Sequence, residues 1–179
     1  HTYYMDVATG APRYGNTQQG YADDSCWSRG QAWGIYGFLL SYIYTGDETM
    51  IALSKRLANY FLNRLPEDYV CHWDLALVGT DALRDSSSAA IAVCGLLELV
   101  KQLPVTDPDR ERYLEWAKGI MSTLTKHYLM GKEEKGNGLL KHSVYHLASN
   151  KGVDECASWG DYFYVEALVR FTQSWKLYW

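Results

Sequence analysis

The segment Ala89–Gln102 constrains the fold most, because it has the length of a helix and almost no polar face. Its central run, AIAVCGLL at residues 90–97, places apolar or small side chains on every side of a helix. Such a helix is stable in water only when other elements cover it all round. The chain has 179 residues, enough for a domain with a core of that depth. The sequence therefore predicts a layered helical fold with this segment inside it.

Two kinds of helix alternate along the chain. Ala32–Leu39 and Ala90–Leu97 share a pattern of small and apolar residues, which indicates an internal repeat. Apolar helices are expected over residues 26–44, 89–102 and 159–175, and amphipathic helices over residues 48–64 and 108–129. Inner helices wrapped by outer helices form an α/α toroid. We therefore predict an all-α fold, with about five to six helices of the toroid present in this chain.

Capping residues mark where the helices start. Asp24 or Ser25 is expected to cap the first helix, Asp47 the second and Asp85 the third, because each offers a side-chain oxygen to unpaired backbone N–H groups. The pair Asp107–Pro108 places proline at the first position of the fourth helix. In a toroid the inner helices direct their N-termini, which carry partial positive charge, toward one mouth. That mouth is predicted to favour an anionic ligand.

The remaining segments are expected to be connectors. Residues 67–84 and 131–157 have no periodic pattern, and only residues 2–7 suggest a short extended piece. No strand pattern is strong enough to predict a central sheet. The sequence thus leaves long loops at the ends of the inner helices, where loops commonly carry function.

Arg29 and Trp33 lie one turn apart at the start of the first predicted helix, so they share a face. A planar cation beside an indole suits a sugar that bears a carboxylate: the ring stacks and the guanidinium binds the acid. Gly30, Gly34 and Gly37 line the same helix and predict close approach of a ligand or another backbone. The alternative is that Arg29 pairs with a structural carboxylate, for which Asp23 or Asp24 is near.

Composition narrows the class of function. Tyrosine and tryptophan, which number 15 and 7, suit amphipathic ligands such as sugars. The net charge of −4, without a basic block, makes a nucleic-acid partner improbable. No apolar run reaches the roughly 20 residues that cross a bilayer. The four cysteines have no disulfide or zinc spacing, and His142 and His146 lack a third ligand, so we expect neither metal nor cofactor. The compartment is left open, cytoplasmic or periplasmic if the source is bacterial.

Three segments together resemble the unsaturated glucuronyl hydrolases, glycoside hydrolase family 88: Gln19–Gly37, Arg84–Ala90 and Trp159–Leu168. The resemblance implies an α6/α6 barrel of six helical hairpins, of which residues 1–179 look like the C-terminal portion of a single domain. It also implies hydrolysis of the Δ4,5-unsaturated uronic acid at the non-reducing end of oligosaccharides that polysaccharide lyases release. In that chemistry an acid protonates the vinyl ether and water adds to it.

The resemblance also assigns residues to the substrate. The family's uronate-binding glutamine falls on Gln19, its carboxylate-contacting arginine on Arg29, the neighbouring tryptophan on Trp33 and a pocket-lining histidine on His1. Gln18 departs from the basic residue common at its position. The family's catalytic aspartates match no position from His1 onward, so no catalytic residue is expected here and the chain alone is expected to be inactive.

The expected partners are an unsaturated oligosaccharide and either the missing N-terminal half or another copy of the chain. Both would associate through exposed faces of the inner helices. Three alternatives stay open at this stage. The chain can instead resemble the related unsaturated rhamnogalacturonyl hydrolases, serve as a non-catalytic sugar-binding or scaffold protein, or belong to a metal enzyme.

Overall fold

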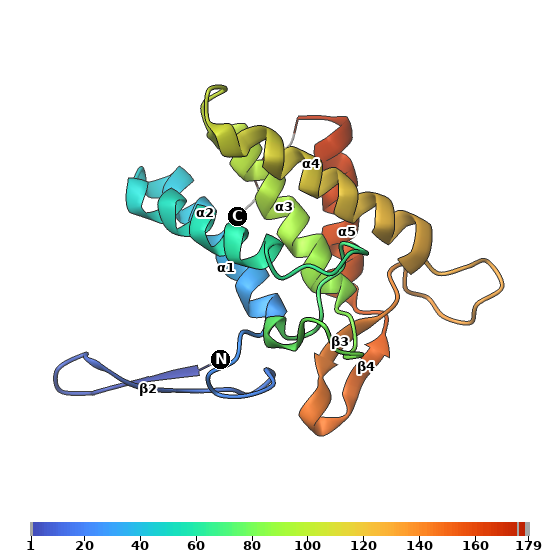
Figure 1. Cartoon of the computed structure of the whole chain (residues 1–179), viewed down its shortest axis with the longest axis horizontal. Coiled ribbons are helices and arrows are strands. Elements are labelled where there is room, and N and C mark those ends of the chain that lie inside the picture. The colour runs from blue at the N-terminus through green and yellow to red at the C-terminus, as the bar shows by residue number, and fades with distance from the viewer. Residues whose placement is uncertain (1, 175, 178–179) are drawn as a thin grey trace.

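A computed structural model describes residues 2–174 and 176–177 of the chain. The described part contains five α-helices and two β-hairpins (Figure 1). The helices are α1 (Ser28–Thr45), α2 (Glu48–Leu62), α3 (Ser86–Gln102), α4 (Pro108–Thr123) and α5 (Ser158–Thr172). The hairpins are β1 (Thr2–Met5) with β2 (Pro12–Asn16) and β3 (Ser143–His146) with β4 (Lys151–Glu155). In the described residues no helix is both long and apolar enough to span a membrane.

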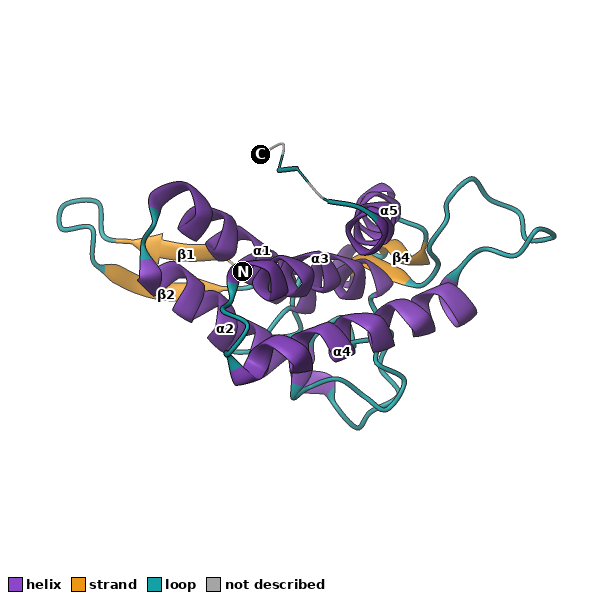
Figure 2. Ribbon diagram, turned by 90° about the horizontal axis from the view of Figure 1, so that it is seen from above, coloured by secondary structure: helices purple, strands orange, loops and turns teal. Residues whose placement is uncertain are grey.

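The helices form two layers. Figure 2 shows α1, α3 and α5 in one layer and α2 and α4 in the other. Helix α3 packs against α1, α4 and α5, and every residue from Ser86 to Leu96 is buried. The central position predicted for this apolar segment is therefore confirmed, as is the alternation of inner and outer helices.

The predicted caps Asp47 and Asp85 are confirmed, as is the helix start predicted at Asp107–Pro108. Asp47, Asp85 and Asp107 accept hydrogen bonds from backbone N–H groups in the first turns of α2, α3 and α4. The prediction for α1 is wrong, because this helix begins at Ser28 without a side-chain cap. The Ser28 N–H instead donates to the Trp73 carbonyl at 3.2 Å, so a segment distant in sequence satisfies the helix start.

The connectors hold more structure than the sequence predicts. The extended piece near the N-terminus is confirmed as β1, but residues 131–157 are not simply irregular, because they contain the β3–β4 hairpin. Both hairpins are antiparallel ribbons of two strands, and neither forms a central sheet. Short strands with few hydrophobic neighbours give a weak period-2 pattern, which explains why the second hairpin was missed.

Gly95 of α3 lies close against the backbone of α1. A Cβ atom placed there would lie 2.8 Å from Ile35 Cγ2 and 3.2 Å from the Tyr36 backbone nitrogen of α1. The glycines of α1 behave differently from the prediction: Gly30 faces the ring of Trp27 and Gly34 faces Leu57. A residue without a side chain is therefore needed where α3 crosses α1, and that residue is Gly95 of α3.

Gly95→Ala is expected to destabilise the fold by about 1–3 kcal/mol, because the new methyl group meets backbone atoms that cannot move aside. Gly37→Ala is the matched control, since a Cβ there meets nothing within 4 Å. That control should stabilise the helix by up to about 1 kcal/mol, the propensity difference between the two residues. Urea denaturation followed by circular dichroism measures both, and equal effects would contradict the close approach.

Candidate functional site

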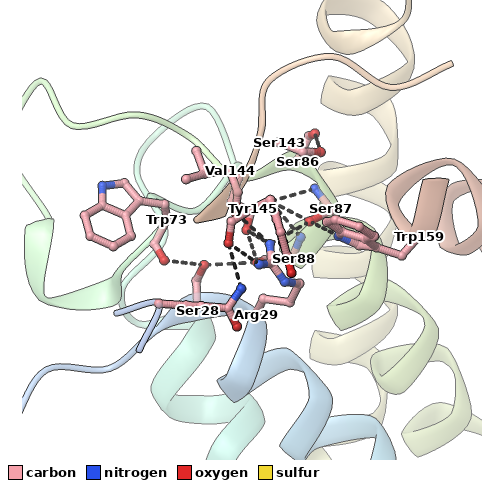
Figure 3. A network of polar contacts seen from close by, with 12 residues as sticks. Ser28, Arg29, Trp73, Ser86, Ser87, Ser88, Ser143, Val144, Tyr145 and Trp159 are labelled. Atoms are coloured by element: carbon pink, nitrogen blue, oxygen red, sulfur yellow. Dashed lines mark hydrogen bonds and ion pairs between the residues drawn. The ribbon is translucent and has the colours of Figure 1, made fainter. Parts of the chain in front are cut away.

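The N-terminal ends of the three inner helices meet at one network of polar contacts (Figure 3). The Ser28 hydroxyl of α1 donates to the Ser88 hydroxyl of α3 at 3.0 Å. The Trp159 indole N–H of α5 donates to the Ser87 hydroxyl at 3.1 Å. The predicted convergence of helix N-termini at one end is thus present in the described part of the fold.

A buried ion pair lies at the centre of this network. The Arg29 guanidinium donates through Nη1 to Asp85 Oδ2 at 2.9 Å, and both side chains are at most 4% exposed. Asp85 also accepts from the backbone N–H groups and hydroxyls of Ser87 and Ser88. One carboxylate therefore caps α3 and neutralises the cation of α1.

The guanidinium of Arg29 also holds the β3–β4 hairpin. Nη1 donates to the Val144 carbonyl at 2.7 Å, and Nη2 donates to the Tyr145 carbonyl at 2.9 Å. The indoles of Trp27 and Trp159 lie 4.7 and 5.3 Å from its central carbon, within the range of cation–π contacts. Burial lowers the pKa of Arg29, while the Asp85 charge opposes that shift.

Gln19 reaches the same hairpin from the loop before α1. Its side-chain Nε2 donates to the Tyr145 carbonyl at 2.8 Å, so Gln19 and Arg29 meet on one oxygen. The loop is fixed by buried Asp74, whose carboxylate accepts from the Tyr21 and Cys26 N–H groups and from the Ser25 hydroxyl. The role of Asp74 could not be predicted from the sequence, because its partners lie about 50 residues earlier in the chain.

Trp33 lies apart from this network. Its ring packs edge-on against Phe163 of α5 with centroids 5.1 Å apart, and the side chain is 38% exposed. The face shared by a guanidinium and an indole does not form between Arg29 and Trp33; Trp27 and Trp159 are the rings beside Arg29. The substrate contact assigned to Trp33 stays a prediction, and His1 lies outside the described residues.

Arg29 pairs with a structural carboxylate, but not with either of the two expected from the sequence. Asp23 and Asp24 were the expected partners, and the observed partner is Asp85, 56 positions along the chain. Asp23 instead accepts from the Thr17 N–H at 2.8 Å and fixes its own loop. Arg29 therefore has a structural role, and its Nη2 group binds the Tyr145 carbonyl of the hairpin.

The described residues contain no group of three or more His, Cys, Asp and Glu side chains that could hold a metal ion. His142 pairs with Asp154 at 2.7 Å, and the ring of His146 accepts from the Ser149 N–H. Both of these histidines thus contact residues of the β3–β4 hairpin.

Comparisons with known proteins agree with the resemblance. The chain is 50% identical, along its whole length, to unsaturated chondroitin disaccharide hydrolase of Streptococcus pneumoniae, of which it covers 46%. It is 41% identical to unsaturated glucuronyl hydrolase of a Bacillus species and covers 48% of that protein. No protein-family model matches the chain.

Solved structures agree as well. The chain superposes on unsaturated glucuronyl hydrolase from Streptococcus agalactiae with a TM-score of 0.94 at 50% identity, covering 100% of this chain and 45% of that one. The chain is therefore a homologue of these hydrolases with part of their α/α toroid fold. It spans about half the length of the relatives it matches.

Asp85→Ala is expected to destabilise the fold by about 3–5 kcal/mol, because it leaves the buried Arg29 cation without a counter-charge. Asp47→Ala removes a cap alone, at the exposed start of α2, and should cost about 1 kcal/mol. Urea denaturation of both variants isolates the contribution of the ion pair. If the two losses are the same, the pair does not stabilise the junction of the inner helices.

Proposed function

We propose that this chain supplies the uronate-binding part of an unsaturated glucuronyl hydrolase. The observation that carries the proposal is the meeting of Gln19 and Arg29 at the N-terminal ends of the inner helices, in a chain about half identical to such hydrolases. Gln19 Nε2 and Arg29 Nη2 each have a second N–H besides the one that binds Tyr145. Two such donors beside positive helix ends suit the carboxylate of a uronic acid.

The proposed substrate is a short oligosaccharide with a Δ4,5-unsaturated uronic acid at its non-reducing end. The pneumococcal relative is named for an unsaturated chondroitin disaccharide, and a variant of the Streptococcus agalactiae enzyme was solved with dGlcA-GalNAc6S. Another solved relative, 41% identical, carries the four-sugar chain dGlcA-Glc-Rha-Glc. The chondroitin-type ligands lead us to favour disaccharides from lyase action on glycosaminoglycans, with other short chains that begin with an unsaturated glucuronate as further substrates.

In the proposed reaction a carboxylic acid protonates C4 of the vinyl ether and water adds at C5. The hemiketal so formed opens and releases the neighbouring sugar. The acid must hold its proton near neutral pH, which calls for an apolar or anionic environment. Asp74 and Asp85 do not suit this task, because both are fully buried and their carboxylate oxygens are already bound by several groups of the fold. We propose that the acid comes from the half of the relatives' fold that this chain does not span.

The outer face of α5 is a suitable surface for that half. Tyr162, Val165 and Leu168 are each at least 40% exposed on it. Glu166 Oε2 is buried and has no hydrogen-bond partner among the described residues. An exposed apolar face with a buried, unpartnered acceptor suits a surface that another polypeptide covers. We accordingly propose that residues 1–179 are part of a single α/α-barrel domain.

The chain alone is expected to bind the unsaturated chondroitin disaccharide without consuming it. Gln19→Ala should weaken this binding about tenfold, the effect of losing one hydrogen bond to a charged group. Titration calorimetry measures both affinities. The methyl ester of the same disaccharide is the matched control, because it lacks the charge and should bind the parent chain and the variant alike. Equal affinity of both proteins for the free acid would refute the role of Gln19.

Co-expression with the unaligned half of the pneumococcal relative is expected to restore turnover. The loss of ultraviolet absorbance of the conjugated acid measures the reaction. Val165→Asp on α5 should abolish the restored activity, because it places a charge in the proposed junction. Val105→Asp, a fully solvated change in the α3–α4 loop, should leave it intact. Turnover by the chain alone would show that the acid lies within residues 1–179.

A further inference from the structure

The β1–β2 hairpin extends away from the helical layers in both views (Figures 1 and 2). A ribbon of two strands is marginally stable in water unless something packs against it. Yet its side chains are exposed, including Tyr3 at 62%, Tyr4 at 43% and Tyr14 at 56%. These three exposed tyrosines add little to the packing of the helical layers, so the stability of the fold does not explain them.

Two of these tyrosines form an ordered aromatic surface. Tyr4 and Tyr14 are directly opposite each other on the two strands, and their rings stack with centroids 4.6 Å apart and planes 22° apart. Tyr3, on the other face, lies across Gly15, where a Cβ atom would be 3.4 Å from its ring. The ribbon thus presents flat apolar rings with polar hydroxyl edges.

The base of the hairpin is joined to the candidate site. Strand β2 ends at Asn16, three positions before Gln19, and the Asn16 side-chain amide lies 3.4 Å from Asp23 Oδ1. The same oxygen accepts from the Thr17 N–H, and the Thr17 hydroxyl accepts from the Gly20 N–H at 2.7 Å. The segment between the tyrosine surface and Gln19 is therefore held in one conformation at one end of the molecule.

Sugars bind such surfaces through their apolar C–H faces, while their hydroxyl groups meet the polar edges of tyrosine rings. When the terminal uronate is bound at Gln19, the remaining sugars of the oligosaccharide extend away from this site toward the reducing end. Strand β2 ends three positions before Gln19, so the remaining sugars of a longer chain could meet the aromatic surface of the hairpin. The alternative, a docking arm for another polypeptide, also uses exposed tyrosines, but it does not explain the rigid link to Gln19.

We infer that the stacked Tyr4–Tyr14 surface is an additional subsite for the sugars that follow the unsaturated uronate. This inference rests on the proposed function and deepens it, because it makes oligosaccharides longer than two sugars better ligands. Ring stacking at this subsite adds about tenfold to the affinity for a tetrasaccharide over a disaccharide.

The test measures, by titration calorimetry, how tightly the 179-residue chain binds the unsaturated chondroitin disaccharide and tetrasaccharide. The parent chain is expected to bind the tetrasaccharide about tenfold more tightly. The double variant Tyr4→Ala with Tyr14→Ala should bind both ligands with the affinity of the disaccharide. Tyr4→Phe with Tyr14→Phe should keep the preference, because it retains the rings and the hairpin stack.

Tyr44→Ala is the matched control, since Tyr44 is 63% exposed at the C-terminal end of α1, away from Gln19. It should leave both affinities unchanged. Equal affinity of the parent chain for both ligands, or a preference that survives the double alanine variant, would overturn the inference while leaving the uronate site intact. Absence of binding to either ligand would overturn the proposed function and the subsite together. A double alanine variant that changes self-association in sedimentation, but not the preference, identifies a docking arm instead.

Discussion

The buried ion pair between Arg29 and Asp85 is the interaction on which the arrangement of the inner helices depends. Each charge alone would be costly in so dry a place, and the geometry compensates by giving both groups several further hydrogen bonds. Because the pair joins the first turn of α1 to the cap of α3, it fixes how the two helices meet. The same guanidinium then sets the position of the β3–β4 hairpin, so the loops at this end depend on it as well.

Much of the helical frame could be predicted from the sequence. An all-apolar segment such as 89–102 has one stable environment, and caps such as Asp47 and Asp85 act on the two or three residues that follow them. Contacts between distant segments could not be predicted in this way. The partner of Arg29 is 56 positions away, and the start of α1 is satisfied by the Trp73 carbonyl. Local pattern carries no information on which distant carboxylate or carbonyl will be nearest.

The candidate site illustrates the same division. The family resemblance, not the helical spacing, assigns Gln19 to the substrate together with Arg29, and that assignment stays a prediction. The structure shows that both side chains bind the Tyr145 carbonyl. The face that Arg29 and Trp33 were expected to share does not form, although the two residues lie one turn apart on α1. Trp33 turns toward Phe163 of α5, while Trp27 and Trp159 approach the guanidinium.

The charge balance of the site determines how a carboxylate could bind there. Asp85 already neutralises Arg29, so the attraction for an anion comes chiefly from the positive ends of the inner helices and from directed N–H groups. A ligand carboxylate would approach the second N–H groups of Gln19 Nε2 and Arg29 Nη2, whose first N–H groups bind the neutral Tyr145 carbonyl. Such binding would leave no buried cation unpaired, because Arg29 keeps Asp85 as its partner. In the site that we propose, stability and affinity therefore depend on separate groups, with Asp85 serving the first and Gln19 the second.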